Sequence, residues 1–277
     1  MKDKKVSNGL FYTFLTILSL AFLSPIFIVL MNSFKGKFFI TKTPFKFPTS
    51  ETFVKLENYI AGIEKTEFFS AFKYSLFITV ASVAAIIFFT SMTAWYITRV
   101  KSKFTKALYY LFAFSMIVPF QMVMFTMSMV ANRTGLDNPI GIIVIYLGFG
   151  SGLSVFMFSG FVKSIPLEIE EAAEIDGCSP IQTYFKVVFP VLKPTAITVA
   201  ILNAMWIWND YLLPYLTIGH DYKTIPIAVQ SLKGSYGSID MGAMMAALVL
   251  AMVPIIIFYF ICQKHIIKGV VAGAVKG

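Results

Sequence analysis

Few side chains of this sequence could carry out covalent chemistry, and they do not form a catalytic group. His220 and His265 each lie near the end of an apolar run, without a serine or carboxylate at a spacing typical of a catalytic pair. Cys178 and Cys262 match no disulfide or zinc-ligand spacing. The sequence also lacks the Gly-x-x-x-x-Gly-Lys-Ser/Thr phosphate loop. We therefore expect that this chain is not an enzyme and binds no metal or cofactor.

The composition is that of a membrane protein. Of the 277 residues, 57% are hydrophobic and only 13% are charged, whereas about a quarter of the residues of a soluble domain are charged. The apolar residues form uncharged runs, which a bilayer favours. The net charge of +9 comes from lysines and arginines between these runs and not from one basic face. This charge is therefore explained by the membrane topology and by contact with anionic lipid, and it does not indicate a nucleic-acid partner.

Six stretches have the length and apolar character of a membrane span. Only the fifth contains a charged residue, Asp210, and a pair of glycines in the fourth, Gly148 and Gly152, has the spacing that lets helices pack closely. We predict an all-α, polytopic integral membrane protein in which residues 1–277 form one permease domain. The predicted spans are residues 10–34, 74–98, 107–132, 138–162, 194–219 and 241–263.

The distribution of positive charge predicts the orientation in the membrane, because cytoplasmic loops retain lysine and arginine. The loop after the second span, residues 99–106, is short and strongly basic, whereas the loop around Arg133 carries a single base. The first of these loops is therefore expected in the cytoplasm, and six spans then place both termini there. Residues 35–73 become a long external loop, in which Pro44 and Pro48 argue against a continuous helix.

The cytoplasmic loop between the fourth and fifth spans, residues 163–193, predicts a short helix that ends at a glycine. Pro166 lies at the start, and the acidic residues 168, 170 and 171 complement the positive end of the helix dipole. Gly177 can adopt the left-handed conformation that terminates a helix. Ile165, Ile169, Ala172 and Ala173 are expected on one face of this helix.

A second helix is predicted directly after this glycine. Ser179 can cap it, Pro180 suits its first position, and Gln182 completes a capping box. The two segments together predict a helix-turn-helix, although an amphipathic loop on the membrane surface is an alternative. The residues expected on one apolar face of the second helix are Ile181, Tyr184, Phe185 and Val188.

This loop resembles the Glu-Ala-Ala motif of ABC import permeases. The resemblance rests on residues 171–173, on the Asp176-Gly177 pair, and on Phe185 and Pro190. It continues through residues 190–194, 208–210, 244–254 and 268–277, which are similar to the second permease of maltose-type and multiple-sugar importers. Asp210 differs from that pattern, in which a glutamate is more usual after the Trp-Asn pair.

The resemblance implies a role and a set of partners. The chain would be the membrane subunit of an ATP-driven carbohydrate importer in the bacterial cytoplasmic membrane. It would pair with a second homologous permease, two ATP-binding cassette subunits that hold ATP and magnesium, and an extracytoplasmic sugar-binding protein. The residues that would couple it to the ATPase are Glu171, Ala172, Ala173, Asp176, Gly177, Phe185 and Pro190.

Two further groups of residues are candidates for a role in transport. The resemblance implies that the tail, residues 265–277, reaches the ATPase dimer interface through Lys268, Gly273, Lys276 and Gly277. The three glycines of the tail make an independent helix unfavourable. Aromatic faces and polar side chains suit a sugar, and the candidates for the substrate path in the fifth span are Asn203, Trp206, Trp208, Asn209 and Asp210.

Asp210 has two readings, because a carboxylate at membrane depth indicates function whereas one at a helix end in water does not. The functional alternatives are an ABC permease for a solute other than a sugar and an ion-coupled secondary transporter. The second usually carries several intramembrane ionisable residues and internal repeats, and the predicted spans contain only Asp210.

Overall fold

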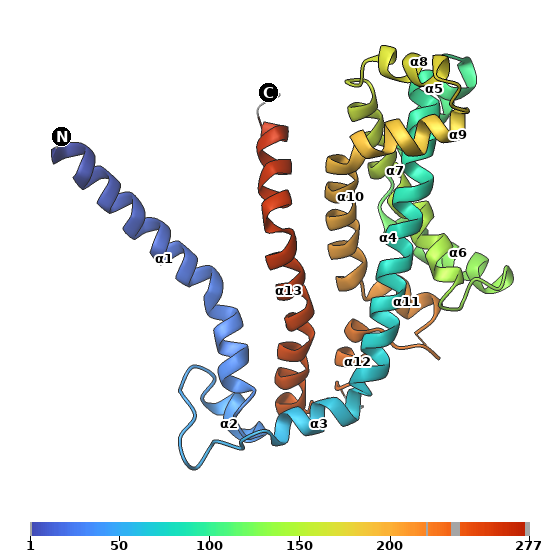
Figure 1. Ribbon diagram of the computed structural model, residues 1–277. Coiled ribbons are helices and arrows are strands. Elements are labelled where there is room, and N and C mark those ends of the chain that lie inside the picture. Colours follow the sequence, from blue (N-terminus) through green and yellow to red (C-terminus); the bar gives the residue numbers. More distant parts are fainter. Residues whose placement is uncertain (1, 220, 234–238, 275–277) are drawn as a thin grey trace. The chain divides into compact units, whose positions relative to one another are not determined.

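The computed structural model describes residues 2–219, 221–233 and 239–274, and the surroundings of side chains for most of the residues between 9 and 264 (Figure 1). These residues form helices and no strand, with only two isolated bridges, which confirms the predicted all-α class. Their contacts divide the chain into unit 1, Met1–Phe69 with Ala228–Pro254, and unit 2, Ser70–Ile227 with Ile255–Gly277. The single permease domain stays a prediction.

The helices follow one another along the chain with short connections. One π-helical segment, η1, lies between α9 and α10. The elements are α1 Lys2–Asn32, α2 Lys37–Lys42, α3 Glu57–Thr66, α4 Phe68–Arg99, α5 Lys103–Ser115, α6 Phe120–Arg133, α7 Gly141–Val162, α8 Leu167–Ile175, α9 Pro180–Thr183, η1 Tyr184–Val188, α10 Phe189–Asn209, α11 Leu212–Thr217, α12 Ile225–Gln230 and α13 Met241–Ala274.

Within the described part of the chain, five helical stretches are long and apolar enough to cross a membrane: Phe11–Asn32, Phe68–Arg99, Gly141–Val162, Pro180–Asn209 and Met241–Lys264. A sixth span is present only if α5 and α6 are counted together, because they are bent by 106° at their junction. Pro119 occupies this junction in an extended conformation, where it can supply no backbone N–H to continue the first helix. The predicted third span, 107–132, is therefore a broken pair of helices.

The predicted end of the fifth span, at residue 219, is wrong. The helix α10 ends at Asn209, and Asp210 takes an extended conformation. The carboxylate of Asp210 then accepts hydrogen bonds from the N–H groups of Leu212, at 3.0 Å, and Leu213, at 3.4 Å. This local capping begins the separate helix α11. Pro214 lies within α11 and does not cause the break.

The segment predicted as an external loop, residues 35–73, lies in unit 1 up to Phe69 and contains α2, α3 and the start of α4, so it forms no continuous helix, as predicted. The amide of Asn58 in α3 donates to the carbonyl oxygens of Ser33 and Lys35, both at 2.8 Å, and so holds the end of α1. Lys65 forms an ion pair with Asp240, just before α13. Burial raises the pKa of Asp240, but hydrogen bonds from Lys65 and the Ala243 N–H outweigh it and leave the pKa below its usual range.

The core of unit 2 lies where α4, α7 and α10 pack together. Its largest buried side chains include two tyrosines and a phenylalanine, which fill the space between these helices. This packing fixes the positions of α4 and α10. The end of α4 and the start of α10 both lie beside the loop that connects α7 to α10. Fully buried residues of this core are Ile78, Ile86, Tyr146, Val155, Phe158, Tyr184, Val188 and Leu192.

The glycines of α7 differ in what surrounds them. A Cβ at Gly152 would lie 2.6 Å from the Ser115 hydroxyl and 2.9 Å from the Phe112 carbonyl oxygen. A Cβ at Gly150 would lie 2.6 Å from the side chain of Ile86. No described atom lies within 4 Å of the corresponding position at Gly148. The close packing predicted for Gly148 and Gly152 is therefore made by Gly150 and Gly152.

This difference predicts opposite effects of one methyl group at two positions of the same helix. We expect Gly152→Ala to destabilise the protein by about 1–3 kcal/mol, because the α5 backbone must move. Gly148→Ala should be neutral or stabilising by up to about 1 kcal/mol, because alanine favours a helix. Thermal unfolding of the two purified variants compares them, and equal melting temperatures would contradict the packing.

Candidate functional site

The loop between α7 and α10 forms the predicted helix-turn-helix. The helix α8 begins after Pro166 and ends at Ile175, and Gly177 has a φ of +80°. The N–H of Cys178 donates to the carbonyl of Ala173 at 2.9 Å, and the N–H of Gly177 donates to that of Glu174 at 3.0 Å. These two bonds are those of a Schellman motif, which satisfies the last carbonyls of the helix. The predicted left-handed glycine is confirmed.

The second helix begins at the predicted residues. The Ser179 hydroxyl accepts from the N–H of Gln182 at 3.4 Å, and the Gln182 side-chain oxygen accepts from the N–H of Ser179 at 2.9 Å. Pro180 occupies the first helical turn, as expected. The capping box is therefore confirmed, and it fixes the direction in which the chain leaves the Gly177 turn.

A π-helical turn then connects α9 to α10. The N–H of Phe189 donates to the carbonyl of Tyr184, five residues earlier, and the next residue, Pro190, has no N–H to donate. The wider turn thus lies directly before the proline, at a position where the regular ladder is interrupted in any case. Pro190, predicted as a coupling residue, is exposed at the start of α10.

The carboxylate of Glu170 fixes α8 to the end of α4. It accepts hydrogen bonds from the Arg99 guanidinium, at 2.9 Å and 2.6 Å, and from the Trp95 indole N–H at 2.8 Å. Arg99 also donates to the carbonyl of Ile165 at 2.9 Å. The side chain of Glu170 is only 6% exposed, so its charge is stabilised by these partners and not by water.

A second contact fixes η1 to the same helix. The hydroxyls of Tyr184 and Ser91 are 2.6 Å apart, and the Tyr184 ring packs against Trp95. Ser91, Trp95 and Arg99 are spaced four residues apart, so they lie on one face of α4. This face therefore holds both halves of the helix-turn-helix, and we call Ser91, Trp95, Arg99, Glu170 and Tyr184 the α4 anchor.

The predicted apolar faces of the two helices are only partly correct. Ile165, Ala173, Tyr184 and Val188 are buried, whereas Ile169, Ala172, Ile181 and Phe185 are exposed. The buried position that completes the face of α8 is occupied by Glu170, a charged residue. A hydrophobic pattern could not identify it, because its burial depends on Arg99 and Trp95 from another helix.

The predicted coupling residues divide in the same way. Ala173 is buried, and the remaining residues are exposed: Glu171, Ala172, Asp176, Gly177, Phe185 and Pro190. Sequence reasoning missed the α4 anchor. The i, i+4, i+8 spacing of a serine, a tryptophan and an arginine at the end of an apolar span was the signal that could have indicated it.

Two adjacent glutamates therefore have different roles in the fold. We expect Glu170→Ala to leave Arg99 without its buried partner and to destabilise this region by about 3–5 kcal/mol. Glu171→Ala removes an exposed charge and should change the stability by less than about 0.5 kcal/mol. Hydrogen–deuterium exchange over residues 163–190 would show the difference. Equal protection of this loop in the two variants would mean that Glu170 does not hold it.

The candidate substrate-path residues do not share one surface. Asn203 is buried and donates to Ser154 at 3.2 Å and to the carbonyl of Val199 at 2.9 Å. Trp208 packs edge-on against Phe72. By contrast, Trp206 and Asn209 lie with Leu202 and Met205 in an exposed stripe along α10.

Asp210 is half-buried at the junction of α10 and α11. Besides capping α11, its carboxylate accepts a hydrogen bond from the Tyr146 hydroxyl at 3.2 Å. The ring of Tyr146 in turn packs edge-on against Trp206. Asp210 therefore positions the end of α10, on which the exposed Trp206 and Asn209 lie.

The tail contains residues that the structure describes only in part. The helix α13 continues to Ala274, so Gly269 and Gly273 lie in the extension of an existing helix, which costs less than nucleating the independent helix that the sequence argued against. Lys268 and Gly273 lie in this helix, and their side-chain surroundings are outside the description. His220, Lys276 and Gly277 lie outside the described residues.

Known proteins are similar in sequence to nearly the whole chain. A permease of Thermoanaerobacterium thermosulfurigenes, AmyC, named as a probable starch degradation products transport protein, is 40% identical over 95% of this chain and 96% of its own. The multiple sugar-binding transport permease MsmG of Streptococcus mutans is 34% identical over 99% of both chains. The melibiose/raffinose/stachyose import permease MelC of Bacillus subtilis is 31% identical over 94% of both.

The fold also matches a solved structure, of a bacterial ABC transporter involved in the import of the polysaccharide alginate. The TM-score is 0.80 at 21% identity, over 95% of this chain and 98% of the other. The model of one protein family, described as the binding-protein-dependent transport system inner membrane component, matches residues 86–271, which include the α4 anchor and the helix-turn-helix. The chain therefore belongs to this family of transport permeases.

Proposed function

We propose that this chain is a membrane-spanning subunit of an ATP-driven importer that carries a carbohydrate, specifically an oligosaccharide, delivered by an external binding protein. The observation that carries the proposal is a helix-turn-helix with one face fixed to α4 and the other face free. Large apolar side chains on the free face are exposed, and Ile175 reaches 86% exposure. Exposed apolar side chains on a rigid support are typical of a protein interaction surface.

The free face suits the ATP-binding cassette subunits as partners. Leu167, Ile169, Ile175, Ile181 and Phe185 supply the apolar contacts, and Glu171 and Asp176 supply exposed acidic groups around them. Closure of two such subunits would pull on this face, and the α4 anchor would pass the movement to α4. ATP and magnesium would be bound by those partners and not by this chain. The tail residues Lys268, Gly273, Lys276 and Gly277 would make a second contact there.

The orientation follows from the position of the same loops. The basic loop after α4 and the helix-turn-helix lie on the same side of unit 2, since Arg99 contacts Glu170 and both Lys101 and Lys163 line one pocket. Because cytoplasmic loops retain positive charge, this side is proposed to be cytoplasmic, with both termini on that side as well.

A carbohydrate is favoured by the relatives and by the exposed stripe of α10. The relatives described above are named for starch products and oligosaccharides. In the stripe, Trp206 offers an aromatic face and Asn209 a side-chain amide, a combination that suits the apolar faces and hydroxyls of sugar rings. A second, homologous permease would cover the opposite side of this path. A solute other than a sugar is the alternative that transport assays distinguish.

The proposal predicts the effect of two substitutions at Gly177. We expect Gly177→Val to abolish most of the ATP-dependent sugar uptake by the assembled transporter in liposomes, because a left-handed valine is strained by about 1–2 kcal/mol. Gly177→Asn should retain uptake, because asparagine tolerates this conformation. No described atom lies within 4 Å of a Cβ at this position. A difference in uptake between the valine and asparagine variants would therefore not come from side-chain size.

Uptake and ATP hydrolysis are measured together, with comparable membrane insertion of the variants as the control. Full uptake by Gly177→Val would contradict the role of the turn. If uptake by the unsubstituted transporter depended on an ion gradient and not on ATP, the proposed ATP-driven import would be contradicted.

A further inference from the structure

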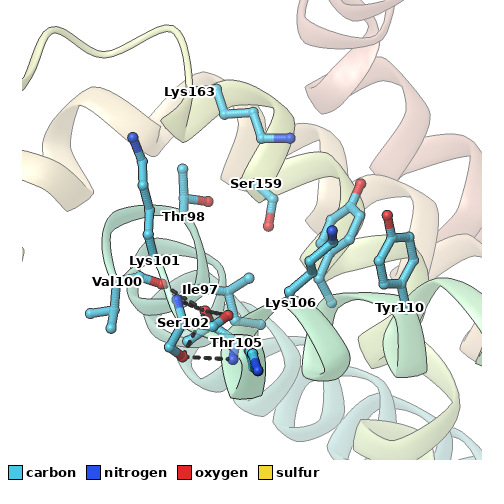
Figure 2. A pocket seen from close by; sticks show the side chains of 12 residues that line it. Ile97, Thr98, Val100, Lys101, Ser102, Thr105, Lys106, Tyr110, Ser159 and Lys163 are labelled. Carbon is cyan, nitrogen blue, oxygen red and sulfur yellow. Dashed lines mark hydrogen bonds between the residues drawn. The ribbon is translucent and has the colours of Figure 1, made fainter.

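A basic pocket lies on the side of unit 2 where the helix-turn-helix is found, but outside the free face. It has a volume of about 570 Å³ and is lined by the end of α4, the turn to α5 and the end of α7 (Figure 2). Four of its lining residues are lysines: Lys101, Lys103, Lys106 and Lys163. None of the 12 lining residues is acidic, so the pocket attracts an anion.

The charges of the pocket are not neutralised by the protein. Among the described residues, Asp240 pairs with Lys65 and Glu170 pairs with Arg99, and none of these four lysines forms an ion pair. Lys163 packs its ammonium over the ring of Tyr109 at 5.4 Å, and Figure 2 shows Lys101 rising from the turn after α4 on the other side of Ser159. Like charges held together repel one another unless an anion lies between them.

Ser159 is one of several described residues whose buried hydroxyl lacks a hydrogen-bond partner. It lines the pocket and is only 1% exposed, and its hydroxyl has no hydrogen-bond partner. Its neighbour Ser154 donates to the carbonyl of Gly150 at 2.7 Å in the same helix. An unpartnered buried hydroxyl is uncommon and costs free energy. A ligand that enters the pocket beside Ser159 would supply the acceptor that this buried hydroxyl lacks.

The floor of the pocket is also suited to an oxyanion. The helix α5 begins there with a capping box in which Ser102 and Thr105 exchange hydrogen bonds of 3.1 Å. The positive end of this 13-residue helix therefore lies beside the lysines. Ammonium groups, a hydroxyl donor and a helix N-terminus together favour a phosphate group.

The surroundings favour a phosphate that belongs to a lipid. Tyrosines line the pocket, as is common at the membrane interface. Along α5, Phe104, Tyr110, Leu111 and Phe114 are between 59% and 67% exposed. These exposed apolar side chains extend along α5 away from the pocket, and acyl chains can lie against them. A soluble phosphate would make no use of this surface.

We propose that the pocket binds the phosphate of an anionic phospholipid headgroup, with the acyl chains along α5. Basic pockets between membrane helices are suited to such headgroups. The binding site stands on the pocket itself, and only its assignment to the cytoplasmic leaflet rests on the proposed topology. A failure of lipid binding would therefore leave the proposed importer function untouched.

Native mass spectrometry of the assembled transporter, purified with its partner subunits, tests the proposal. The probe is phosphatidylglycerol, compared with phosphatidylcholine. Lys101→Gln with Lys106→Gln should lower the retained phosphatidylglycerol roughly 20-fold, at about fivefold per lysine. The matched control is Lys42→Gln with Lys46→Gln, which removes two exposed charges elsewhere and should retain the lipid.

A second variant separates binding from folding. Ser159→Ala should lower phosphatidylglycerol retention about fivefold while leaving the melting temperature of the lipid-free complex unchanged or higher, because it removes an unpartnered hydroxyl. Unchanged retention in both pocket variants would overturn the site. Equal retention of phosphatidylcholine would overturn its selectivity for an anion.

Competition identifies the source of the phosphate. Glycerol phosphate or inorganic phosphate, added in excess, should not displace phosphatidylglycerol, because neither has acyl chains to lie along α5. If either compound displaced phosphatidylglycerol at a concentration similar to that of the lipid, the pocket would be a site for a soluble phosphate. The proposed lipid site would then be wrong.

Discussion

The buried carboxylate of Glu170, held by Arg99 and Trp95, is the constraint on which the arrangement of unit 2 depends. Water cannot stabilise a charge at this buried position. The carboxylate is stabilised instead by the three hydrogen bonds that it accepts from Trp95 and Arg99 of α4. The helix α8 can then lie in only one orientation. A polar contact of this kind specifies a unique geometry more strongly than apolar packing, which tolerates small slips.

The rest of the helix-turn-helix follows from this orientation. Gly177 and the Ser179 capping box turn the chain back toward α4, where Tyr184 meets Ser91. The two attachments on α4 are eight residues, or about 12 Å, apart. One face of the motif is consequently occupied by its own membrane helix, and Ile175 and Ile181 remain on the free face. Phe185 lies at the edge of this face, where its exposed ring also stacks on Phe88 of α4 at 6.2 Å. An interface that transmits movement requires a rigid support and an apolar face that is free to bind a partner. The helix-turn-helix has both.

The sequence was informative wherever structure is determined locally. The Gly177 turn and the Ser179 capping box were predicted correctly, because a few neighbouring residues define each of them. The burial of Glu170 in place of Ile169 could not be predicted, since it depends on Arg99, some seventy positions away. The sequence left two readings open for Asp210, because a capping carboxylate at a helix end and an intramembrane charge look alike in a sequence. Gly150 was overlooked for a similar reason, as its neighbour Ile86 belongs to another helix.

The most direct test of the account is a double-mutant cycle between Arg99 and Glu170. Arg99→Met, Glu170→Met and the double variant are compared for ATP-dependent uptake and thermal stability in the assembled transporter. Each single variant leaves one buried charge unpaired, whereas the double variant replaces the pair by apolar side chains. The account predicts that the double variant loses no more uptake and stability than the worse single variant. Losses that simply add across the two positions would contradict it.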